Sequence, residues 1–367
     1  MENKKDNELS RRSFLKGLGA SAMVLGGVGG AFSFRGYAAD PLKITTYGGI
    51  FKEVMNDVLV QPFKEDTGID VKITPFEAEE ALLSLKRAVD ANNAPVDVPI
   101  IAQRSVIQGA NMGIWREYSP NALDNLKYIP PSLVTKSNDK VVGVGALSWY
   151  LNLVYNKEVI EEPLDSWKVL WDSEYRNQCG VNRNPAPSYL LDIAAVTYFD
   201  GQEILKTEEG IMEVMEKLKE IKPQVKLWWE SEAEFEGPLT DGEVPIGQLY
   251  NDVTLVMQDQ GEPVETVFPK EGGVLDHGEW PILKTTKKYA EALLFIDYSC
   301  KPEVQNEIAR NLYSAPALKK EYVNLPEGME SKISGPGVEA AIKPDPNLYI
   351  GEMDQFIREK WNQNILA

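Results

Sequence analysis

The 367-residue sequence is poor in the residues that most metal and redox sites need. It has one histidine, His277, and two cysteines, Cys179 and Cys300. A zinc, haem or iron–sulfur site takes several His or Cys ligands, so the sequence predicts no metal and no cofactor. The two cysteines lie far apart in the chain without a flanking motif, which favours two buried free thiols over a disulfide.

Signatures of catalysis are missing as well. The sequence contains neither a Gly-x-Ser-x-Gly motif nor a Gly-x-x-x-x-Gly-Lys-Ser/Thr phosphate loop. Some pair among the 56 acidic residues would suit a secreted carboxylate-dependent hydrolase in any chain of this composition, so that alternative is weak. We expect a protein that is not an enzyme and has no catalytic residues.

Basic residues are outnumbered, with 38 Lys and Arg against 56 Asp and Glu and a net charge of −18. Such a surface repels nucleic acid and anionic lipid, so no nucleic-acid partner is expected. Hydrophobic residues make up 43% of the chain, which allows a substantial core, and the length suggests two lobes. After residue 39, no segment approaches the length of a membrane span.

A long apolar stretch occurs near the N-terminus, in residues 17–34, where many glycines interrupt it. It follows the sequence Ser10-Arg11-Arg12-Ser13-Phe14-Leu15-Lys16, and Gly36-Tyr37-Ala38 offers small residues for cleavage. Residues 1–39 therefore resemble a twin-arginine signal peptide, the alternative being an amphipathic start with a chance arginine pair. We expect an exported, periplasmic protein.

Strands and helices alternate after this segment. The pattern predicts strands at 42–46, 69–73 and 96–102 and helices at 51–63 and 81–89. A second unit of the same kind begins after Ser148. This alternation predicts a parallel α/β sheet, in which ligands bind at the carboxyl ends of the strands. The loops 47–49 and 103–105 are therefore the first candidates for a site.

Several stretches, in their shared order, resemble the periplasmic binding proteins of ABC importers, specifically the spermidine/putrescine-binding type. They are PFKEDTGIDV (62–71), VDV (96–98) with GIW (113–115), WYLNLVYN (149–156), FPKEGG (268–273) and the helix pair at 290–307. The resemblance implies a two-lobed α/β fold whose crossover strands lie near Ala146–Tyr150 and Tyr250–Asp252, with a ligand cleft between the lobes. Lobe 1 would comprise residues 40–147 and 252–322, and lobe 2 residues 148–251 and 323–367.

The same resemblance implies a monomeric substrate-binding component of an ABC transporter. It would capture a small solute outside the cytoplasmic membrane and deliver it to the permease subunits. A polyamine or related organic amine is favoured as the ligand. An anionic organic solute, or a role as a ligand sensor for a membrane receptor, remains the alternative.

Aromatic and acidic residues supply candidate contacts for an amine. Trp229 and Glu230 follow a predicted strand, where an indole face can hold an ammonium group, although a core Trp beside a solvated acidic loop is the plainer interpretation. Tyr250, Asn251 and Asp252 end another strand at the expected hinge, and a turn in which Asn251 bonds its own backbone is an alternative there.

Further candidates lie on the crossovers and in the first loops. Of Trp149 and Tyr150, one should face the cleft and the other the core, because strand neighbours alternate. The remaining expected ligand-binding residues are Tyr47, Gly48, Arg104, Asp276 and Trp280. Gly48 and Arg104 could instead bind an anionic group. His277 is expected to be a surface-loop histidine rather than a ligand.

Overall fold

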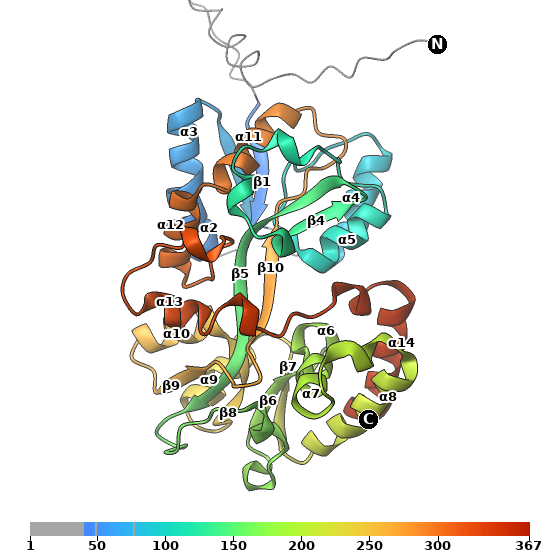
Figure 1. Ribbon diagram of the computed structural model, residues 1–367, viewed down its shortest axis with the longest axis vertical. Coiled ribbons are helices and arrows are strands. Elements are labelled where there is room, and N and C mark those ends of the chain that lie inside the picture. The colour runs from blue at the N-terminus through green and yellow to red at the C-terminus, as the bar shows by residue number, and fades with distance from the viewer. Residues whose placement is uncertain (1–39, 48–49, 76–77) are drawn as a thin grey trace, which may run out of the picture. The chain divides into compact units, whose positions relative to one another are not determined.

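The computed structural model describes residues 40–47, 50–75 and 78–367. Residues 1–39 and Gly48 lie outside the described part, so the twin-arginine signal and the Gly48 contact stay predictions. Residues Asp40–Ala367 form one compact unit (Figure 1). Within the described ranges, no helix combines the length and the apolar character needed to cross a membrane.

The strands fall into a two-stranded and an eight-stranded sheet. They are β1 (Leu42–Thr46), β2 (Val71–Pro75), β3 (Ile101–Ala102), β4 (Val134–Ser137), β5 (Lys140–Asn156), β6 (Cys179–Asn182), β7 (Val225–Trp229), β8 (Ile246–Tyr250), β9 (Val264–Val267) and β10 (Val274–Glu279). The larger sheet has the order β3-β10-β5-β8-β6-β7, and β4 and β9 also pair with β5.

The α-helices cover these sheets. They are α2 (Ile50–Met55), α3 (Gln61–Thr67), α4 (Ala78–Asp90), α5 (Gln103–Asn111), α6 (Pro185–Ser188), α7 (Leu190–Tyr198), α8 (Glu208–Leu218), α9 (Glu232–Thr240), α10 (Asn251–Asp259), α11 (Tyr289–Ser299), α12 (Pro302–Leu312), α13 (Met329–Ser334) and α14 (Gly351–Trp361). Short 3₁₀ turns connect many of them.

Local sequence explains where several helices begin and end. Helix α8 begins after Thr207, whose hydroxyl accepts a hydrogen bond from the Gly210 N–H at 3.1 Å, as a capping residue does. Helix α12 begins with Pro302, which cannot donate a backbone hydrogen bond and suits the first turn. Helix α3 ends at Gly68, which adopts φ of 72° without a Cβ clash.

The sheet is mixed, which corrects the expected parallel arrangement. Strands β1 and β2 are parallel, as are β6–β7 and β6–β8. However, β5 runs antiparallel to β8, β9 and β10. The alternation of strands and helices identifies the parallel units, but it carries no signal for a single long strand that joins them.

Strand β5 is 17 residues long and connects two lobes. Figure 1 shows β5 and β10 passing side by side between the upper and the lower part of the compact unit. Ala146 and Leu147 pack in the cluster that contains Ile44, whereas Leu151 and Leu153 pack in the cluster that contains Trp167. The two crossover strands therefore pass from one hydrophobic core to the other.

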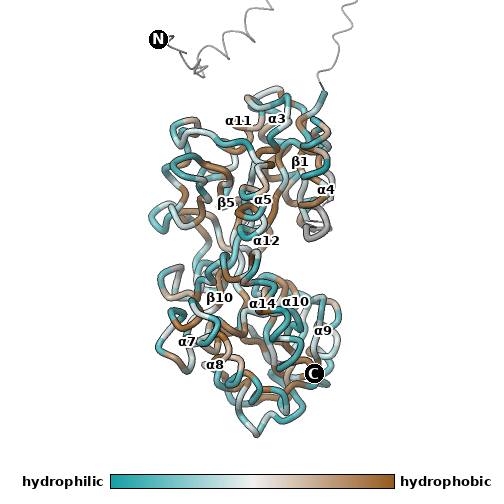
Figure 2. The backbone as a smooth tube through the Cα atoms, turned by 90° about the vertical axis from the view of Figure 1, so that its right-hand side faces the viewer, coloured by the Kyte–Doolittle hydropathy of each residue, from teal (hydrophilic) through white to brown (hydrophobic). Residues whose placement is uncertain are grey.

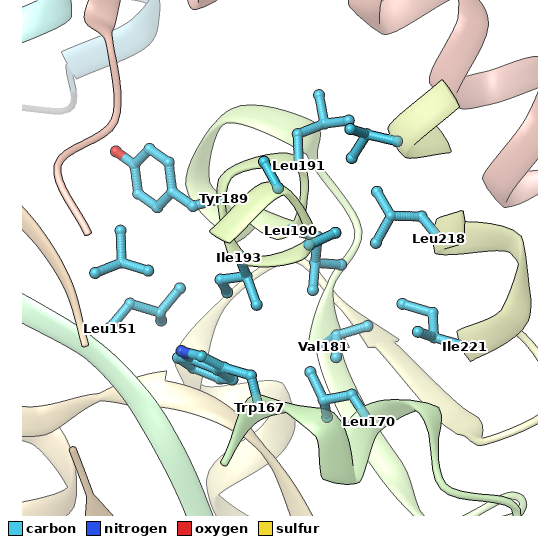
Figure 3. Close-up of a cluster of buried hydrophobic side chains, with 14 of the residues drawn as sticks. Leu151, Trp167, Leu170, Val181, Tyr189, Leu190, Leu191, Ile193, Leu218 and Ile221 are labelled. Carbon is cyan, nitrogen blue, oxygen red and sulfur yellow. The ribbon is translucent and has the colours of Figure 1, made fainter. Parts of the chain in front are cut away.

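Each lobe has its own principal core, and Figure 2 shows hydrophobic segments in both. Lobe 1, built around β1, α11 and α12, buries Phe63, Trp280 and Phe295. Lobe 2, built around β6, α7, α8 and α14, buries Trp167 of the turn η5 (Trp167–Trp171) and Ile193 of α7, whose side chains converge in Figure 3. This two-core arrangement is the two-lobed α/β fold expected from the sequence.

The exact lobe boundaries stay a prediction, but the packing of α10 and β9 concerns the boundary expected at Asp252. Met257 of α10 and Val264 of β9 pack in one cluster with Val154 and Trp229 of lobe 2. The chain returns toward lobe 1 only along β10, after Val274.

The two cysteines are buried free thiols, with Cys179 in the lobe 2 core and Cys300 in the lobe 1 core.

Candidate functional site

A cavity of about 210 Å³ lies where the two lobes meet β10. Its wall comes from separate stretches of the chain: Gln103 and Arg104 of α5, Ser132, Leu133, Tyr189, then Leu275, Asp276 and His277 of β10, and finally Lys343, Pro344, Pro346 and Tyr349. Both lobes and a crossover strand therefore contribute to it. Such a wall changes shape if the lobes move relative to each other, which is the property of a hinged ligand site.

Two of the expected site residues, Arg104 and Asp276, line this cavity. Arg104 lies in the first turn of α5, directly after β3, where the strand-end rule places ligand contacts. Asp276 is half-buried, and its Oδ2 accepts a hydrogen bond from the Tyr189 hydroxyl at 2.5 Å. Its Oδ1 accepts from the His277 N–H at 2.7 Å. The cavity wall thus carries both a guanidinium and an oriented carboxylate.

Four tyrosines surround these charges. Burial raises the pKa of Tyr47, Tyr189, Tyr250 and Tyr349, and in each case Arg104 opposes the shift. The Asp276 charge adds to the increase in Tyr47, Tyr189 and Tyr250. All four phenol groups therefore remain neutral at physiological pH, and they lie close enough to Arg104 for its charge to affect their pKa.

Trp149 and Tyr150 point to opposite sides of β5, as the strand alternation predicts. Trp149 is half-buried and meets Tyr47 edge to face at 6.1 Å between ring centroids. It is also paired in register with Asp276 of β10, so the two side chains share a face. Tyr150 is buried against Phe268, with 5.0 Å between ring centroids. Trp149 is thus the member of the pair beside the cavity.

Trp229 and Trp280, two expected ligand contacts, are core residues instead. Trp229 is fully buried and stacks on Phe235, and Trp280 is 1% exposed and meets Phe295 edge to face at 5.4 Å. Of the adjacent pair Trp228 and Trp229, which point to opposite sides of β7, Trp228 is the half-buried member, and it packs on Trp361.

Glu230 is exposed and forms an ion pair with Arg183 at 2.5 Å. It is not among the residues that line the cavity. An exposed ion pair contributes little free energy, about 1 kcal/mol at most. Glu232, another acidic residue that follows β7, lies near the end of β8, where its charge raises the pKa of Tyr250.

The stretch Tyr250–Asp252 contains two buried polar side chains with different surroundings. Asn251 is saturated, since its Oδ1 accepts from Asn152 and Thr266 while its Nδ2 donates to the Lys332 carbonyl at 2.8 Å. Asp252 is 8% exposed, and its Oδ1 has no hydrogen-bond partner among the described residues. Asn251 therefore holds the hinge region together, whereas Asp252 keeps an acceptor unused.

Burial raises the pKa of Asp252 to about 7. Hydrogen bonds from backbone N–H groups at the start of α10 oppose this shift, and the Glu232 charge adds to it. The charges of Asp252 and Glu232 also raise the pKa of Tyr250, as does that of Asp276, so all three carboxyl groups lie near Tyr250. A cation placed between them would offset their repulsion.

His277 differs most from its expected place. It is 5% exposed and lies on β10 rather than in a surface loop, because both lobes cover this crossover strand. Its Nε2 is 2.9 Å from Oε1 of Glu279, a fully buried carboxyl group that also accepts a hydrogen bond from the Thr135 hydroxyl. The Nε2 edge of the imidazole therefore contacts Glu279, and the residue also lines the cavity.

A family model of bacterial extracellular solute-binding proteins matches residues 58–331. The chain belongs to this family. It is therefore a protein that binds a small solute, and it is not an enzyme, as the sequence led us to expect. Within the described residues, no group of three or more His, Cys, Asp or Glu side chains is placed to hold a metal ion.

Relatives of this solute-binding protein agree with the resemblance stated from the sequence. A gamma-aminobutyric acid-binding protein of Pseudomonas aeruginosa is 24% identical over 80% of this chain and 81% of its own length. A spermidine/putrescine-binding periplasmic protein of Salmonella typhimurium is 23% identical over 87% of this chain and 91% of its own. A substrate-binding protein of an ABC transporter from Bradyrhizobium japonicum has the same fold, with a TM-score of 0.77, 18% identity, and coverage of 89% of this chain and 100% of its own.

Sequence reasoning missed several residues of the solute-binding protein's cavity. Tyr189 lies between α6 and α7, in the connection that follows β6, and adopts φ of 48°, an uncommon backbone conformation for a non-glycine residue. The rule that directs attention to the carboxyl ends of parallel strands could have found it. Lys343 and Tyr349 carry no comparable signal, because they belong to an irregular segment far along the chain.

Proposed function

We propose that the protein is the solute-binding component of an ABC importer. In this role it captures a small solute outside the cytoplasmic membrane, closes its lobes by bending β5 and β10, and delivers the solute to the permease. The family membership, the names of the relatives and a cavity lined from both lobes support this proposal. Export through the twin-arginine signal in residues 1–39 is part of it.

We further propose that the solute is a small organic amine that also carries an acidic group, such as an ω-amino acid. The observation that carries this proposal is the presence of both charge signs on one cavity wall. Arg104 and Lys343 line it together with Asp276. A diamine would place one ammonium group near Asp276 but would bring the other toward like charges, at a cost in Coulomb energy.

Each end of such a solute has suitable partners. A carboxylate fits the planar fork of Arg104, with Lys343 as a second cation. An ammonium group fits the acidic side formed by Asp276 and, beyond Tyr250, by Asp252 and Glu232. Trp149 and Tyr47 provide aromatic surface beside this acidic side. A relative that is named for binding gamma-aminobutyric acid supports the same class.

A polyamine is the second candidate, and one observation favours it. Asp252 keeps a buried oxygen that has no partner in the described part of the chain and lies near Glu232, so this side could take an additional ammonium group. The spermidine/putrescine-binding relatives agree with this candidate. The two candidates differ in whether the solute needs an acidic group.

Isothermal titration calorimetry with four probes separates them: γ-aminobutyrate, putrescine, spermidine and butyrate. We expect γ-aminobutyrate to bind and butyrate to bind far more weakly, because only the first satisfies both sides of the cavity. Thermal unfolding provides a check, since a solute at 100 times its Kd stabilises the protein by about 2.7 kcal/mol. Binding of putrescine and spermidine alone would replace the first candidate by the second.

A further inference from the structure

One segment just before helix α14 also lines the cavity. We call this segment, residues 342–349, the strap. Figure 1 shows it as the dark red segment that leads from beside β10 to α14. At its start, the Ile342 N–H donates to the Gly273 carbonyl, and the Ile342 carbonyl accepts from the Leu275 N–H, both at 2.9 Å. Four of the residues that follow form one side of the cavity: Lys343, Pro344, Pro346 and Tyr349.

The strap contains little regular structure of its own. After the pairing at Ile342, its only helical turn is the 3₁₀ turn η11 (Pro346–Tyr349). Pro344 and Pro346 lack backbone N–H groups and cannot extend a ladder of hydrogen bonds. Packing of Leu348 and Tyr349 in the lobe 2 core, together with side-chain ties to lobe 2, therefore holds this part of the wall in place.

One buried carboxyl group provides these ties. Asp192 of α7 is fully buried, and its Oδ2 accepts a hydrogen bond from the Tyr349 hydroxyl at 2.5 Å. Its Oδ1 accepts from Nε2 of Gln202 at 2.6 Å, and the same nitrogen donates to the Lys343 carbonyl at 3.0 Å. Asp192 thus connects to both ends of the stretch that lines the cavity, although it does not line the cavity itself.

The surroundings of Asp192 oppose its charge. Burial raises its pKa to about 6, the hydrogen bonds from Tyr349 and Gln202 limit the shift, and the Asp345 charge adds to it. The other titratable groups on this side are Tyr189, whose ring lies 5.9 Å from that of Tyr349, Asp276, which accepts from the Tyr189 hydroxyl, and the cavity-lining His277, Lys343 and Arg104.

We propose that Asp192 is a positioning residue that holds the strap against the cavity, and that its protonation loosens the strap and weakens solute binding. As a carboxylate, Asp192 accepts from both donors at once. A protonated carboxyl group donates its own O–H to the Tyr349 hydroxyl, which then accepts, and keeps Oδ1 as the acceptor for the Gln202 amide, so both charge-assisted hydrogen bonds become weaker neutral ones. The effect on solute affinity rests on the proposed function, whereas the effect on the strap does not.

Amide hydrogen exchange of the purified protein without solute tests the strap directly. We expect residues 345–350, corrected for intrinsic exchange rates, to lose protection as the pH falls from 7.5 to 5. Asp192→Asn should show the low protection at every pH, because its amide group also offers one acceptor and one donor. Asp297→Asn is the matched control, since Asp297 is a buried carboxyl group of lobe 1 that accepts from Asn125.

Gln202→Ala provides a second variant in case Asp192→Asn does not fold. It removes a partly exposed amide group and leaves the Tyr349 tie intact, so a partial loss of protection is expected. The proposal is overturned if the strap keeps its protection in both variants, if Asp297→Asn lowers it equally, or if the pH dependence persists in Asp192→Asn.

Calorimetric titration with γ-aminobutyrate between pH 5 and 7.5 tests the second half of the proposal. We expect Asp192→Asn to bind about tenfold more weakly at pH 7.5 than the wild type, the loss of one charge-assisted hydrogen bond, and to show a flatter pH dependence. If the exchange results hold while none of the amine or carboxylate probes binds, the proposed solute class fails and the role of Asp192 in the strap remains.

Discussion

The lobe cores and the cavity wall use aromatic side chains in different ways. In the cores, Trp229 and Trp280 are enclosed by other hydrophobic residues, and their indole N–H groups have no partner among the described residues. At the cavity wall, the Tyr189 and Tyr349 hydroxyls each donate to a carboxylate. At this wall, a carboxylate therefore fixes the orientation of each tyrosine.

The difference follows from what each region must do. A core gains free energy from buried apolar area and tolerates an isolated indole N–H at a limited cost. A wall that faces a polar solute must orient its polar groups before the solute arrives, because disorder would be lost again on binding. Tyrosines tied to Asp276 and Asp192 meet this requirement.

The largest expected effect comes from removing a core indole. Trp229→Ala should lower the free energy of unfolding by about 3–5 kcal/mol, because it leaves a cavity in the cluster around Val154 and Leu249. Trp149→Ala should destabilise much less, since Trp149 is only half-buried, but it should weaken solute binding. Urea unfolding and calorimetry measure the two effects. A stable Trp229→Ala protein that fails to bind solute would contradict the distinction between core and cavity-wall aromatic residues.

Removing the cavity guanidinium should affect binding rather than folding. We expect Arg104→Met to weaken γ-aminobutyrate binding tenfold to a hundredfold, about the loss of a hydrogen bond to a charged group, 1.5–3 kcal/mol. Arg183→Met is the control, because Arg183 is an arginine outside the cavity that pairs with Glu230 on the surface. Equal losses in the two variants would remove Arg104 from the site.

The pH dependence of stability tests Asp252, which does not line the cavity. Its pKa rises from 3.8 in the unfolded chain to about 7 in the folded protein, so the folded protein binds this proton more tightly. The resulting stability is fully present below pH 4 and is lost as the pH rises through about 7, by at most about 1.4 kcal/mol per pH unit.

Asp252→Asn should therefore gain stability relative to the wild type as the pH increases from 4 to 8. Thermal unfolding across this range measures the difference, and Asp192→Asn should show a similar but smaller trend that ends near pH 6. A wild-type protein that becomes more stable than Asp252→Asn with rising pH would show that Asp252 is ionised at no cost in the fold.

The smallest effect is expected at Glu230. Glu230→Gln breaks an exposed ion pair with Arg183 and should change the unfolding free energy by less than about 1 kcal/mol. Solute affinity should stay within error of the wild type, because Glu230 does not line the cavity. A clear loss of affinity in calorimetry would restore the contact expected from the sequence.

Local patterns predicted much of the secondary structure. The strand expected at 42–46 matches β1, and the helix expected at 81–89 lies within α4. These elements could be predicted because their apolar residues recur with the period of the element itself. The full length of β5 could not, since residues 141–148 are buried on both faces and carry no period.

The site was predicted in part. Arg104 and Asp276 line the cavity, and Tyr47, Trp149 and Tyr250 lie near its charges. Trp280 and Trp229 do not, because the sequence says that a strand residue faces one side but not which side is covered by another layer. His277 was misplaced for the converse reason, since a polar residue on a crossover strand is buried by both lobes.

The sequence by itself determined the two-unit α/β character, the acidic surface, the shortage of metal ligands and the resemblance to solute-binding proteins. These properties depend on composition, short periods and local motifs. Only the tertiary structure decided which side chains meet at the cavity, because Tyr189, Asp276 and Lys343 are brought together over more than a hundred residues of chain. Contacts of that range depend on how the sheets and helices pack, and no local pattern records them.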